Sequence, residues 1–455
     1  MRVLLIHPPS PDWRGTPLLG TQYLAASLLG NGIEVRVLDA GAPLVSPDDD
    51  EIAAEARKFR PDLIGVSLFT RRVARAYRLA AKLRGIAPLL VAGGPHATVC
   101  PEEPLAHGFD AVLTGEGEVS LVRLVRAMER GEPPDGIPGM VVRGPDGGIV
   151  RGPLPVPIRD LDSLPIPLTS QHLFDPAWYS AEAGETLPGG ILTSRGCPAR
   201  CVFCANQVTG RSFRFRSAAG VVDEIRTIHA RTGNTFLPCW DDALTANAPR
   251  LLELCDAIRD HLGFPFRWSA ITRATMVTPE MLGAMKRAGL VAVNFGIESG
   301  DDATLRMIRK GQTTAQVVRA LEWAKAEGLM TVCNFMMGFP GETADALRRT
   351  LEFMRRIEPL TDCFSTGGVV IPMPGTELYE KHHERYGFTR WWLEEDPTAD
   401  SLTQIAPDPA DDPNLARDFF RYDTDVRNLI AECLDFKARH NHARFGSHRP
   451  ASFAT

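Results

Sequence analysis

The sequence has little of what marks exported, membrane-embedded or nucleic-acid-binding proteins. No apolar run approaches the roughly 20 residues that a membrane-spanning helix needs, and the chain begins directly with the strand-like run 1–7 instead of an export signal. The net charge is −6, so no surface for a polyanion is expected. The nine cysteines, an odd number, are mostly scattered, which argues against a secreted disulfide framework. We therefore expect a soluble, cytoplasmic protein that binds neither membranes nor nucleic acid.

What the chain does have is length and an ordinary globular composition. Its 455 residues, 44% hydrophobic and 23% charged, are too many for one typical domain. Changes in pattern along the chain predict four segments. They are a first α/β domain at 1–130, a linker rich in Pro and Gly at 131–189, a second α/β domain at 190–380 and an acidic, helical extension at 381–455.

The first domain alternates short β-branched runs with helical patterns. The runs are 3–6, 35–38, 63–67, 89–92 and 111–113, and helices are expected at 18–29 and 72–83, among others. This rhythm predicts a doubly wound, Rossmann-like parallel sheet with helices on both faces. Ligands of such sheets bind beyond the carboxyl ends of the strands, so the loops after the strands are the first place to look for a site.

Two of those loops are rich in glycine. The fourth run is followed by Gly93, Gly94 and His96, and the fifth by Gly115, Glu116 and Gly117. Glycines there let the backbone approach a large or phosphate-bearing ligand closely. Glycines at strand ends also serve simply as turns, so each loop alone is weak evidence. Together these six residues are candidates for binding a cofactor.

Three cysteines lie close together in the middle of the chain. Cys197, Cys201 and Cys204 form a C-x3-C-x2-C set, and Phe203 precedes the third. Three thiolates on one loop suit a [4Fe-4S] cluster and leave its fourth iron open to a small ligand. The alternative is structural zinc, which takes four N or S ligands. No further C-x-x-C pair or H-x3-5-H follows, so the spacing favours the cluster.

The second domain again alternates strands and helices. Strands are expected at 191–193, 236–240, 266–269, 291–295, 331–335 and 364–371, with helices at 218–230, 249–261, 279–287, 314–326 and 344–357. Six such units predict a partial (β/α)6 barrel, whose site lies at the carboxyl ends of the strands. Polar residues and glycines follow four of the strands: Asp241, Asp242, Arg273, Glu298, Ser299 and Gly338.

The cysteine spacing and these strand ends resemble the radical S-adenosylmethionine (SAM) superfamily. In that family the open iron binds the amino and carboxylate groups of SAM, and reductive cleavage gives a 5′-deoxyadenosyl radical. The resemblance implies that the three cysteines hold the cluster. It gives Asp241 or Asp242 the SAM amino group or nearby substrate, Arg273 the carboxylate, Glu298 the ribose and the backbone up to Gly338 the adenine. Phe203 and Ser299, inside the same motifs, join them as candidate contacts.

Each of these roles is chemically sensible and each residue also has a structural interpretation. An arginine pairs bidentately with a carboxylate, and glycine admits a flat base. Taken singly, however, Arg273 is an ordinary surface cation, and Glu298 is a charge near the start of a helix. Their order behind the cysteine set favours the functional interpretation.

The first 130 residues resemble the cobalamin-binding domain that precedes the radical SAM domain in bacteriochlorophyll-ring cyclases and cobalamin-dependent methyltransferases. No D-x-H-x-x-G occurs, so no histidine is expected to ligate cobalt from below. Arg71 and Arg72 follow Phe69 and Thr70, where small hydroxylated residues are usual in that family. These cations either occupy ligand space or simply begin a solvated helix. We expect bound cobalamin, and a vestigial domain is the alternative.

The end of the chain is acidic. Between Arg390 and Arg417 there is no Lys or Arg, and beside Trp391 and Trp392 stand the carboxylates Glu394, Glu395, Asp396, Asp400, Asp408, Asp411 and Asp412. The plain interpretation is a solvated loop. The sharper one is an acidic, aromatic lid that attracts a cationic substrate such as an aminosugar. A closing helix is expected at 415–439 and a frayed tail at 440–448.

These features predict a radical SAM enzyme that acts on a small polar, natural-product-like metabolite and takes its electron from an external flavodoxin- or ferredoxin-type reductant. With cobalamin bound, the expected reaction is C-methylation. Without it, the substrate radical eliminates water, as in the radical SAM diol dehydratases of apramycin-type aminoglycoside pathways, which the compact chain and acidic end also resemble. A third class, a cluster- or zinc-carrying scaffold, is disfavoured by the ordered SAM contacts.

Overall fold

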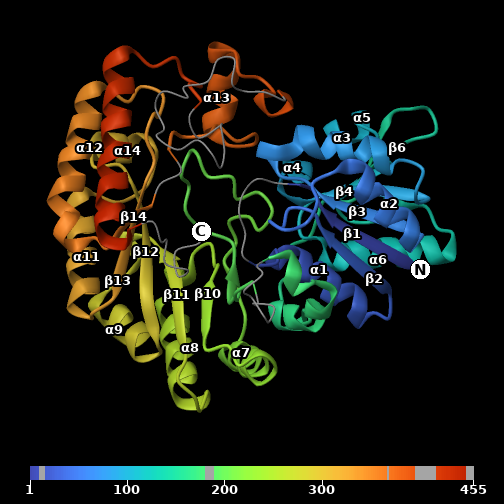
Figure 1. Ribbon diagram of the computed structural model, residues 1–455, viewed down its shortest axis with the longest axis horizontal. Coiled ribbons are helices and arrows are strands. Elements are labelled where there is room, and N and C mark those ends of the chain that lie inside the picture. Colours follow the sequence, from blue (N-terminus) through green and yellow to red (C-terminus); the bar gives the residue numbers. More distant parts are fainter. Residues whose placement is uncertain (10–15, 180–188, 366–367, 395–416, 447–455) are drawn as a thin grey trace. The chain divides into compact units, whose positions relative to one another are not determined.

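The structure is a computed structural model that describes residues 1–9, 16–179, 189–365, 368–394 and 417–446 (Figure 1). Its contacts divide the chain into two units. The first comprises Met1–Gly189, Ala205–Gly210 and a short segment that contains Trp391 and Trp392. The second comprises Gly190–Cys204, Arg211–Thr389 and the carboxyl-terminal part of the chain.

The first unit is built on a seven-stranded sheet in the order β2-β1-β3-β4-β5-β6-β7. Its strands are β1 (Arg2–His7), β2 (Glu34–Asp39), β3 (Leu63–Ser67), β4 (Leu89–Gly93), β5 (Ala111–Leu113), β6 (Met140–Arg143) and β7 (Ile149–Arg151). The first five pair in parallel, which confirms the predicted doubly wound sheet. Because β1 pairs with both β2 and β3, the strand order reverses beside β1.

Helices cover both faces of this sheet. They are α1 (Leu19–Gly30), α2 (Asp49–Phe59), α3 (Val73–Leu83), α4 (Gly94–Val99), α5 (Glu103–Ala106) and α6 (Gly117–Arg130), with 3-10 turns η1 (Thr70–Arg72), η2 (Pro134–Gly136), η3 (Leu161–Ser163), η4 (Pro167–Leu173) and η5 (Pro176–Trp178). One face of the sheet packs on α1 and α6, where Val3 and Leu5 of β1 share a core with Leu28 and Leu124. Figure 1 shows α3 on the other side of the sheet.

Residues 131–179 of the predicted linker are held to the first unit. Strands β6 and β7 extend the sheet in antiparallel pairing. Beyond them the Ser170 hydroxyl donates to Gln22 O at 3.0 Å, and the Tyr179 hydroxyl donates to Asp39 Oδ2 at 2.7 Å. Prolines do prevent long helices here, but the side chains between them anchor the segment to the first unit.

The second unit contains a parallel sheet in the order β10-β11-β12-β13-β14. These strands are β10 (Phe236–Cys239), β11 (Arg267–Thr272), β12 (Leu290–Glu298), β13 (Met330–Phe335) and β14 (Cys363–Ser365), and a separate antiparallel pair is β8 (Ser194–Arg195) with β9 (Arg214–Phe215). The strand expected at 191–193 is reduced to one parallel bridge between Ile191 and Cys239. The partial barrel therefore has five regular strands and a minimal first one.

Helices follow the strands as predicted. They are α7 (Ala218–Thr232), α8 (Ala248–His261), α9 (Pro279–Arg287), α10 (Asp302–Met307), α11 (Thr314–Ala326), α12 (Ala344–Ile357), α13 (Glu377–Tyr386) and α14 (Thr424–Phe445), with turns η6 (Leu244–Ala246), η7 (Ala274–Met276), η8 (Glu358–Leu360) and η9 (Trp391–Leu393), of which η9 lies in the first unit. All eight begin at a Ser, Thr, Asn or Asp whose side chain accepts a backbone N–H. No helix in the described ranges combines the length and the apolar character that crossing a membrane requires.

The two faces of the second sheet differ in character. Outward-facing aromatic side chains contact the helices: the Phe335 ring lies 6.4 Å from Phe353 of α12, and the Phe364 ring 5.6 Å from Phe436 of α14. Figure 1 shows α11, α12 and α14 along this outer face. Because side chains alternate along a strand, the residues between these aromatic residues face inward.

Helix α14 is fastened to the edge strand β14 by one side chain. Asn441 Oδ1 accepts the Phe364 N–H at 2.9 Å, and Asn441 Nδ2 donates to Phe364 O at 2.7 Å. The neighbouring His440 is buried and its Nδ1 lies 3.2 Å from Glu358 Oε1. The expectation of a frayed tail from residue 440 is therefore wrong up to Phe445, where α14 ends.

We predict that Asn441→Ala loosens α14. Both backbone groups of Phe364 lose their partner, at about 1–3 kcal/mol for each group left unsatisfied. Amide hydrogen exchange should therefore become faster in α14. Asn31→Ala, which removes one bond from Asn31 Nδ2 to Ser27 O at the end of α1, is the control and should leave α14 unchanged. Equal protection of α14 in both variants would contradict this account.

Candidate active site

The carboxyl end of β12 has an unusual backbone. Glu298 has a φ of 72°, in the left-handed region that few residues other than glycine occupy. The register between β12 and β13 shifts between Gly296 and Glu298, and the Met336 N–H donates to Glu298 O at 2.9 Å. Residues in such conformations cluster at functional sites, where the surrounding structure enforces them. The site is therefore built outward from Glu298.

Lys310 pairs with the Glu298 carboxylate inside the protein. Lys310 Nζ lies 2.7 Å from Glu298 Oε1, with side-chain exposures of 8% and 10%. Gly296 makes this possible, because a Cβ there would lie 2.8 Å from Lys310 Nζ. No hydrogen bond to Glu298 Oε2 is found among the described residues. One carboxylate oxygen is thus fixed while the other can accept from a ligand hydroxyl.

A second cation stands at the end of the neighbouring strand. Arg273 follows β11, and its Nη2 lies 3.8 Å from the position of a Cβ at Gly311. Its Nε is buried and makes no hydrogen bond within the part of the chain that the structure describes. Gln312, next to Gly311, donates from Nε2 to Gly296 O and Ile297 O, both at 3.1 Å. A buried guanidinium with an unsatisfied donor suits a ligand carboxylate.

The turn after β13 presents backbone instead of side chains. Gly338 and Gly341 have φ values of 82° and 85°. The N–H groups of Gly338 and Phe339 both donate to Glu342 Oε2, at 2.7 and 3.2 Å. Burial raises the pKa of Glu342 to about 7, although these two bonds partly oppose the shift. The turn is buried at Gly338 and Phe339 and is fixed through two of its backbone N–H groups.

The two aspartates after β10 hold the strand that leads into the cysteine loop. Asp241 accepts three hydrogen bonds. The Thr193 N–H donates to Asp241 Oδ1 at 2.6 Å. The hydroxyls of Thr193 and Ser194 both donate to Oδ2, the second of them at 2.6 Å. The Gly196 N–H donates to Asp242 Oδ2 at 3.1 Å. Both oxygens of the buried Asp241 are engaged, so this carboxylate positions the loop, and its predicted contact with SAM or substrate stays a prediction.

The cysteine loop contacts the two turns described above. The Val202 N–H donates to Ile308 O at 3.2 Å, two residues before Lys310. The Phe203 ring lies 5.6 Å from the Phe339 ring, next to Gly338. The structure therefore brings Phe203, Arg273, Glu298 and Gly338 to one end of the sheet together with the cysteines.

Cys197, Cys201 and Cys204 form no disulfide among the described residues, and Cys204 is exposed. Across the described ranges, no three His, Cys, Asp or Glu side chains converge around a point that would hold a single metal ion. Each thiolate of a [4Fe-4S] cluster binds a different iron, so the sulfurs need to border a shared space and not a common point. Three thiols on one loop fit such a cluster, whereas the set lacks the fourth ligand of a structural zinc site.

Ser299 does not belong to the site. It is fully buried, and its Oγ lies 3.1 Å from Thr350 Oγ1 and accepts the Asp301 N–H at 3.1 Å. It supports the start of α10.

Two residues of the site, Lys310 and Glu342, were not predicted from the sequence. A lysine before a glycine, twelve residues beyond Glu298, and a glutamate closing Gly-Phe-Pro-Gly were the available signals.

In the first unit, the loops after β3, β4 and β5 are hydrogen-bonded to one another. The Leu68 N–H donates to Gly93 O at 2.8 Å, and the Gly115 N–H donates to Thr98 Oγ1 at 3.0 Å. At Gly94, with φ 90°, a Cβ would lie 3.1 Å from the Leu68 backbone. Glycine is thus required for this close packing, and the loops form a continuous edge near the strand reversal that fits a broad ligand.

Gly115 is also required, since its φ is 77° and a Cβ there would lie 2.8 Å from Pro155, whereas a Cβ at Gly117 would meet only the end of the Leu24 side chain. Between them, Glu116 Oε2 accepts the Ile158 N–H at 2.7 Å. This carboxylate therefore fixes the segment that follows β7. The predicted cofactor contacts in this loop are left to its backbone.

His96 has a different place from the one predicted. It is fully buried, with Nδ1 3.1 Å from Thr70 Oγ1 and Nε2 2.9 Å from Glu103 Oε1. Glu103 also accepts from the Tyr77 hydroxyl at 2.9 Å and from Trp392 Nε1 at 3.0 Å. Both ring nitrogens are engaged, so the His96 side chain is a structural element and not a cofactor ligand.

The tryptophans of the predicted lid are not available for stacking. Trp391 and Trp392 are 1% and 4% exposed. The carboxylates from Glu395 to Asp412 lie outside the described residues. Arg71 and Arg72 form the turn η1 that leads into α3, which agrees with their interpretation as a helix start.

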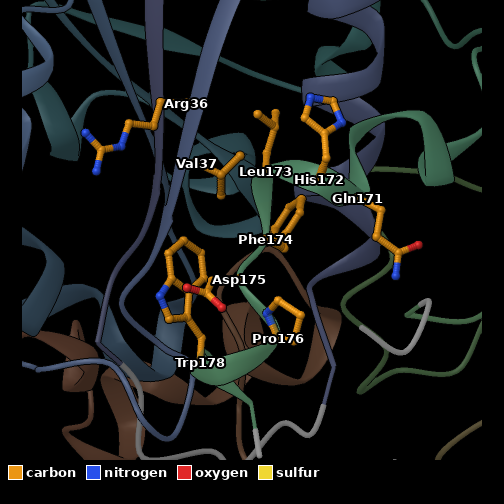
Figure 2. A pocket seen from close by; sticks show the side chains of 9 residues that line it. All are labelled: Arg36, Val37, Gln171, His172, Leu173, Phe174, Asp175, Pro176 and Trp178. Atoms are coloured by element: carbon orange, nitrogen blue, oxygen red, sulfur yellow. The ribbon is translucent and has the colours of Figure 1, made fainter. Parts of the chain in front are cut away.

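A hollow of about 510 Å³ lies elsewhere in the first unit (Figure 2). Arg36 and Val37 line it from the middle of strand β2, and the rest of its wall is the segment 171–178. None of the predicted site residues lines it. We therefore do not place the site in this hollow.

Comparison with known proteins agrees with this geometry. Residues 191–354 match the sequence model of the Radical SAM superfamily, and residues 16–125 match that of the B12 binding domain. A methyltransferase of Pyrococcus horikoshii that is itself uncharacterized is 33% identical over 393 residues, which cover 84% of this chain and 83% of the relative. The chain belongs to the radical SAM superfamily.

Two further proteins are similar to this radical SAM enzyme. The anaerobic magnesium-protoporphyrin IX monomethyl ester cyclase of Rubrivivax gelatinosus is 28% identical and is matched over 84% of this chain and 70% of its own length. The radical SAM methyltransferase TsrM from Kitasatospora setae, solved with cobalamin and a [4Fe-4S] cluster, has a TM-score of 0.69 at 20% identity, over 93% of this chain and 86% of TsrM. The likeness to TsrM shows the fold.

The chain is a radical SAM enzyme of the methyltransferase type with an amino-terminal B12-binding domain. Its cofactors are a [4Fe-4S] cluster, SAM and cobalamin. The unsatisfied Arg273 donor and the open Glu298 oxygen fit the carboxylate and a hydroxyl of SAM. The interlocked glycine loops of the first unit fit cobalamin.

We predict that Glu298→Gln and Arg273→Ala keep the cluster but weaken SAM binding. Each removes one charge-assisted hydrogen bond, so affinity should fall by roughly ten- to a hundredfold. Equilibrium binding under anaerobic conditions, together with iron analysis, measures both effects. Glu253→Gln on α8, an exposed carboxylate, is the control. SAM affinity equal to the control in both variants would mean that this end of the sheet does not bind SAM.

Asp241→Ala should release the cysteine loop from the sheet. Three hydrogen bonds to a buried carboxylate are lost, at about 3 kcal/mol or more in total. Iron content per chain and melting temperature should both fall. Asp242→Ala, which gives up the bond from Gly196, should have a smaller effect. Full iron content in Asp241→Ala would show that the loop does not depend on this anchor.

Proposed function

We propose that this enzyme transfers a methyl group from cobalamin to a carbon of a small polar substrate. The observation that carries the proposal is the pairing of a B12-binding domain at 16–125 with a radical SAM domain at 191–354 in one chain. The Pyrococcus relative, described as a methyltransferase, supports it. When bound, the cluster and SAM supply a 5′-deoxyadenosyl radical that removes hydrogen from the substrate, and cobalamin supplies the methyl group.

The residues of the chain bind and orient SAM in this proposal. Cys197, Cys201 and Cys204 hold the cluster at the end of the sheet. Arg273 holds the SAM carboxylate, and Glu298, with one oxygen fixed by Lys310, accepts from the ribose. The backbone at Gly338 lies against the adenine. Excluding water at this end protects the radical from quenching.

The inward face of the sheet supports a polar substrate without net charge. Asn334 Nδ2 donates to Asn294 Oδ1 across β12 and β13. The pair keeps one donor and one acceptor that are not used within the described chain, whichever way the amides are turned. Ser269 and Ser365 occupy inward positions on β11 and β14, as judged from the outward Trp268 and Phe364. A hydroxyl or amide group suits this wall.

The aminosugar hypothesis retains only a charge argument. Stacking of a sugar on Trp391 and Trp392 is excluded because both side chains are buried, and the acidic run lies largely outside the described residues.

The alternative reaction, dehydration without cobalamin, requires a first domain that has lost its cofactor site. The hydrogen-bonded glycine loops of that domain are intact. We retain an external one-electron reductant of the flavodoxin or ferredoxin type as part of the proposal, because cleavage of SAM consumes an electron.

The proposal is tested with anaerobically purified protein supplied with hydroxocobalamin. We expect the absorption spectrum to show bound cobalamin and the reduced protein to form 5′-deoxyadenosine from SAM. Cys201→Ala should lose iron and SAM cleavage and keep cobalamin, because the two sites lie in different units.

Matched controls are Cys333→Ala and Cys433→Ala. Burial raises the pKa of both thiols to about 12, so they are poor cluster ligands. Both variants should keep cluster and activity. Absence of cobalamin from the wild-type protein would refute the methyl-transfer proposal, and normal iron in Cys201→Ala would refute the cluster site.

A further inference from the structure

The segment before α14 reaches back to the glycine turn of the barrel. The Tyr422 hydroxyl donates to Gly338 O, and Tyr422 is buried. The contact is close enough that a Cβ at residue 338 would lie 2.2 Å from the Tyr422 hydroxyl oxygen. Gly338 is thus held on both sides, its N–H by Glu342 and its carbonyl by Tyr422. Its φ is 82°, in the left-handed region.

Tyr422 itself is fixed by its surroundings. Its N–H donates to the Asp418 carboxylate at 3.0 and 3.1 Å, and its carbonyl accepts from Arg427 Nε at 3.0 Å. Arg427 Nη2 donates to Asp418 Oδ2 at 2.6 Å, which closes the loop. Because Arg427 lies on α14 and α14 is bound to β14 through Asn441, the Tyr422 hydroxyl is anchored to the sheet and not to a loose tail.

The same turn touches the cysteine loop. Phe339, next to Gly338, is buried and packs against Phe203, which lies between Cys201 and Cys204. A change in the orientation of the Gly338 peptide therefore acts on two things at once: the turn that is proposed to hold the adenine and the packing beneath the cluster loop.

We propose that the carboxyl-terminal extension is part of the SAM site, with Tyr422 as a positioning residue for the Gly338 turn. Its hydroxyl orients the Gly338 carbonyl and, together with Glu342, fixes the backbone of the turn that is proposed to hold the adenine. This inference rests on the proposed placement of SAM. By linkage, if the seated extension favours SAM binding, bound SAM must stabilise the seated extension to the same degree.

The test compares Tyr422→Phe with Tyr386→Phe. Tyr422→Phe removes only the hydroxyl that holds Gly338 O, and Tyr386→Phe removes a hydroxyl from the neighbouring aromatic cluster, where the Tyr386 ring lies 5.3 Å from Phe420. SAM dissociation constants are measured anaerobically with the cluster oxidised, so that no cleavage occurs. We expect about five- to twentyfold weaker binding in Tyr422→Phe with full iron content, and wild-type binding in Tyr386→Phe.

A second measurement needs no variant. Amide hydrogen exchange in residues 417–430 of the wild-type holoenzyme is followed with and without SAM, and SAM should slow it by a similar factor. The inference would be overturned if Tyr422→Phe bound SAM as tightly as the wild type. It would also be overturned if the exchange rate in residues 417–430 were the same with and without SAM. If SAM does not bind at this end of the sheet at all, Glu298→Gln would also bind SAM normally. If only the Tyr422 inference is wrong, Glu298→Gln would still bind SAM weakly.

Discussion

The buried ion pair between Glu298 and Lys310 is the interaction on which the candidate site depends. It places a carboxylate with a left-handed backbone at the end of β12, where the strand register shifts against β13. Two charges at this depth are costly to desolvate, and removing either one leaves the other buried without a partner, a change that typically costs about 3–5 kcal/mol. Such a pair contributes little to stability. Its value lies in fixing one oxygen of Glu298 and leaving the other for a ligand.

From this pair, contacts extend to every other part of the site in the second unit. The turn that carries Lys310 also carries Ile308, which bonds the cysteine loop. The backbone of Glu298 accepts from Met336 at the end of β13, and two residues further on Gly338 is held by Glu342 and Tyr422. The cysteine loop, the end of β12 at Glu298 and the Gly338 turn are thus parts of one hydrogen-bonded assembly. A disturbance in one of them is expected to reach the others.

The sequence could predict the features that follow from local pattern. The five parallel strands of the first unit and the barrel strands from β10 onward are confirmed, because buried parallel strands are continuous β-branched or apolar runs. The three cysteines, Arg273, Glu298 and Gly338 were found from motifs and strand ends, and the structure brings them together.

The errors concern long-range partners, which spacing alone does not reveal. Nothing near His96 in the sequence shows that Glu103 and Thr70 will take both of its ring nitrogens. The anchoring role of Asp241 was missed because its partners, Thr193 and Ser194, lie almost fifty residues earlier. The tryptophans at 391 and 392 were assigned to a lid because hydrophobic burial against the first unit cannot be read from their acidic neighbours.

The central claim is that Glu298 and Lys310 act on SAM as one unit, and a double-mutant cycle on the SAM dissociation constant tests it most directly. Glu298→Gln and Lys310→Met are measured singly and together under anaerobic conditions, with iron content as a check on the cluster. The account predicts that each single change weakens binding and that the double variant is hardly weaker than Glu298→Gln alone, a coupling of about 1 kcal/mol or more. Additive losses, or a Lys310→Met protein that binds SAM as the wild type does, would contradict it.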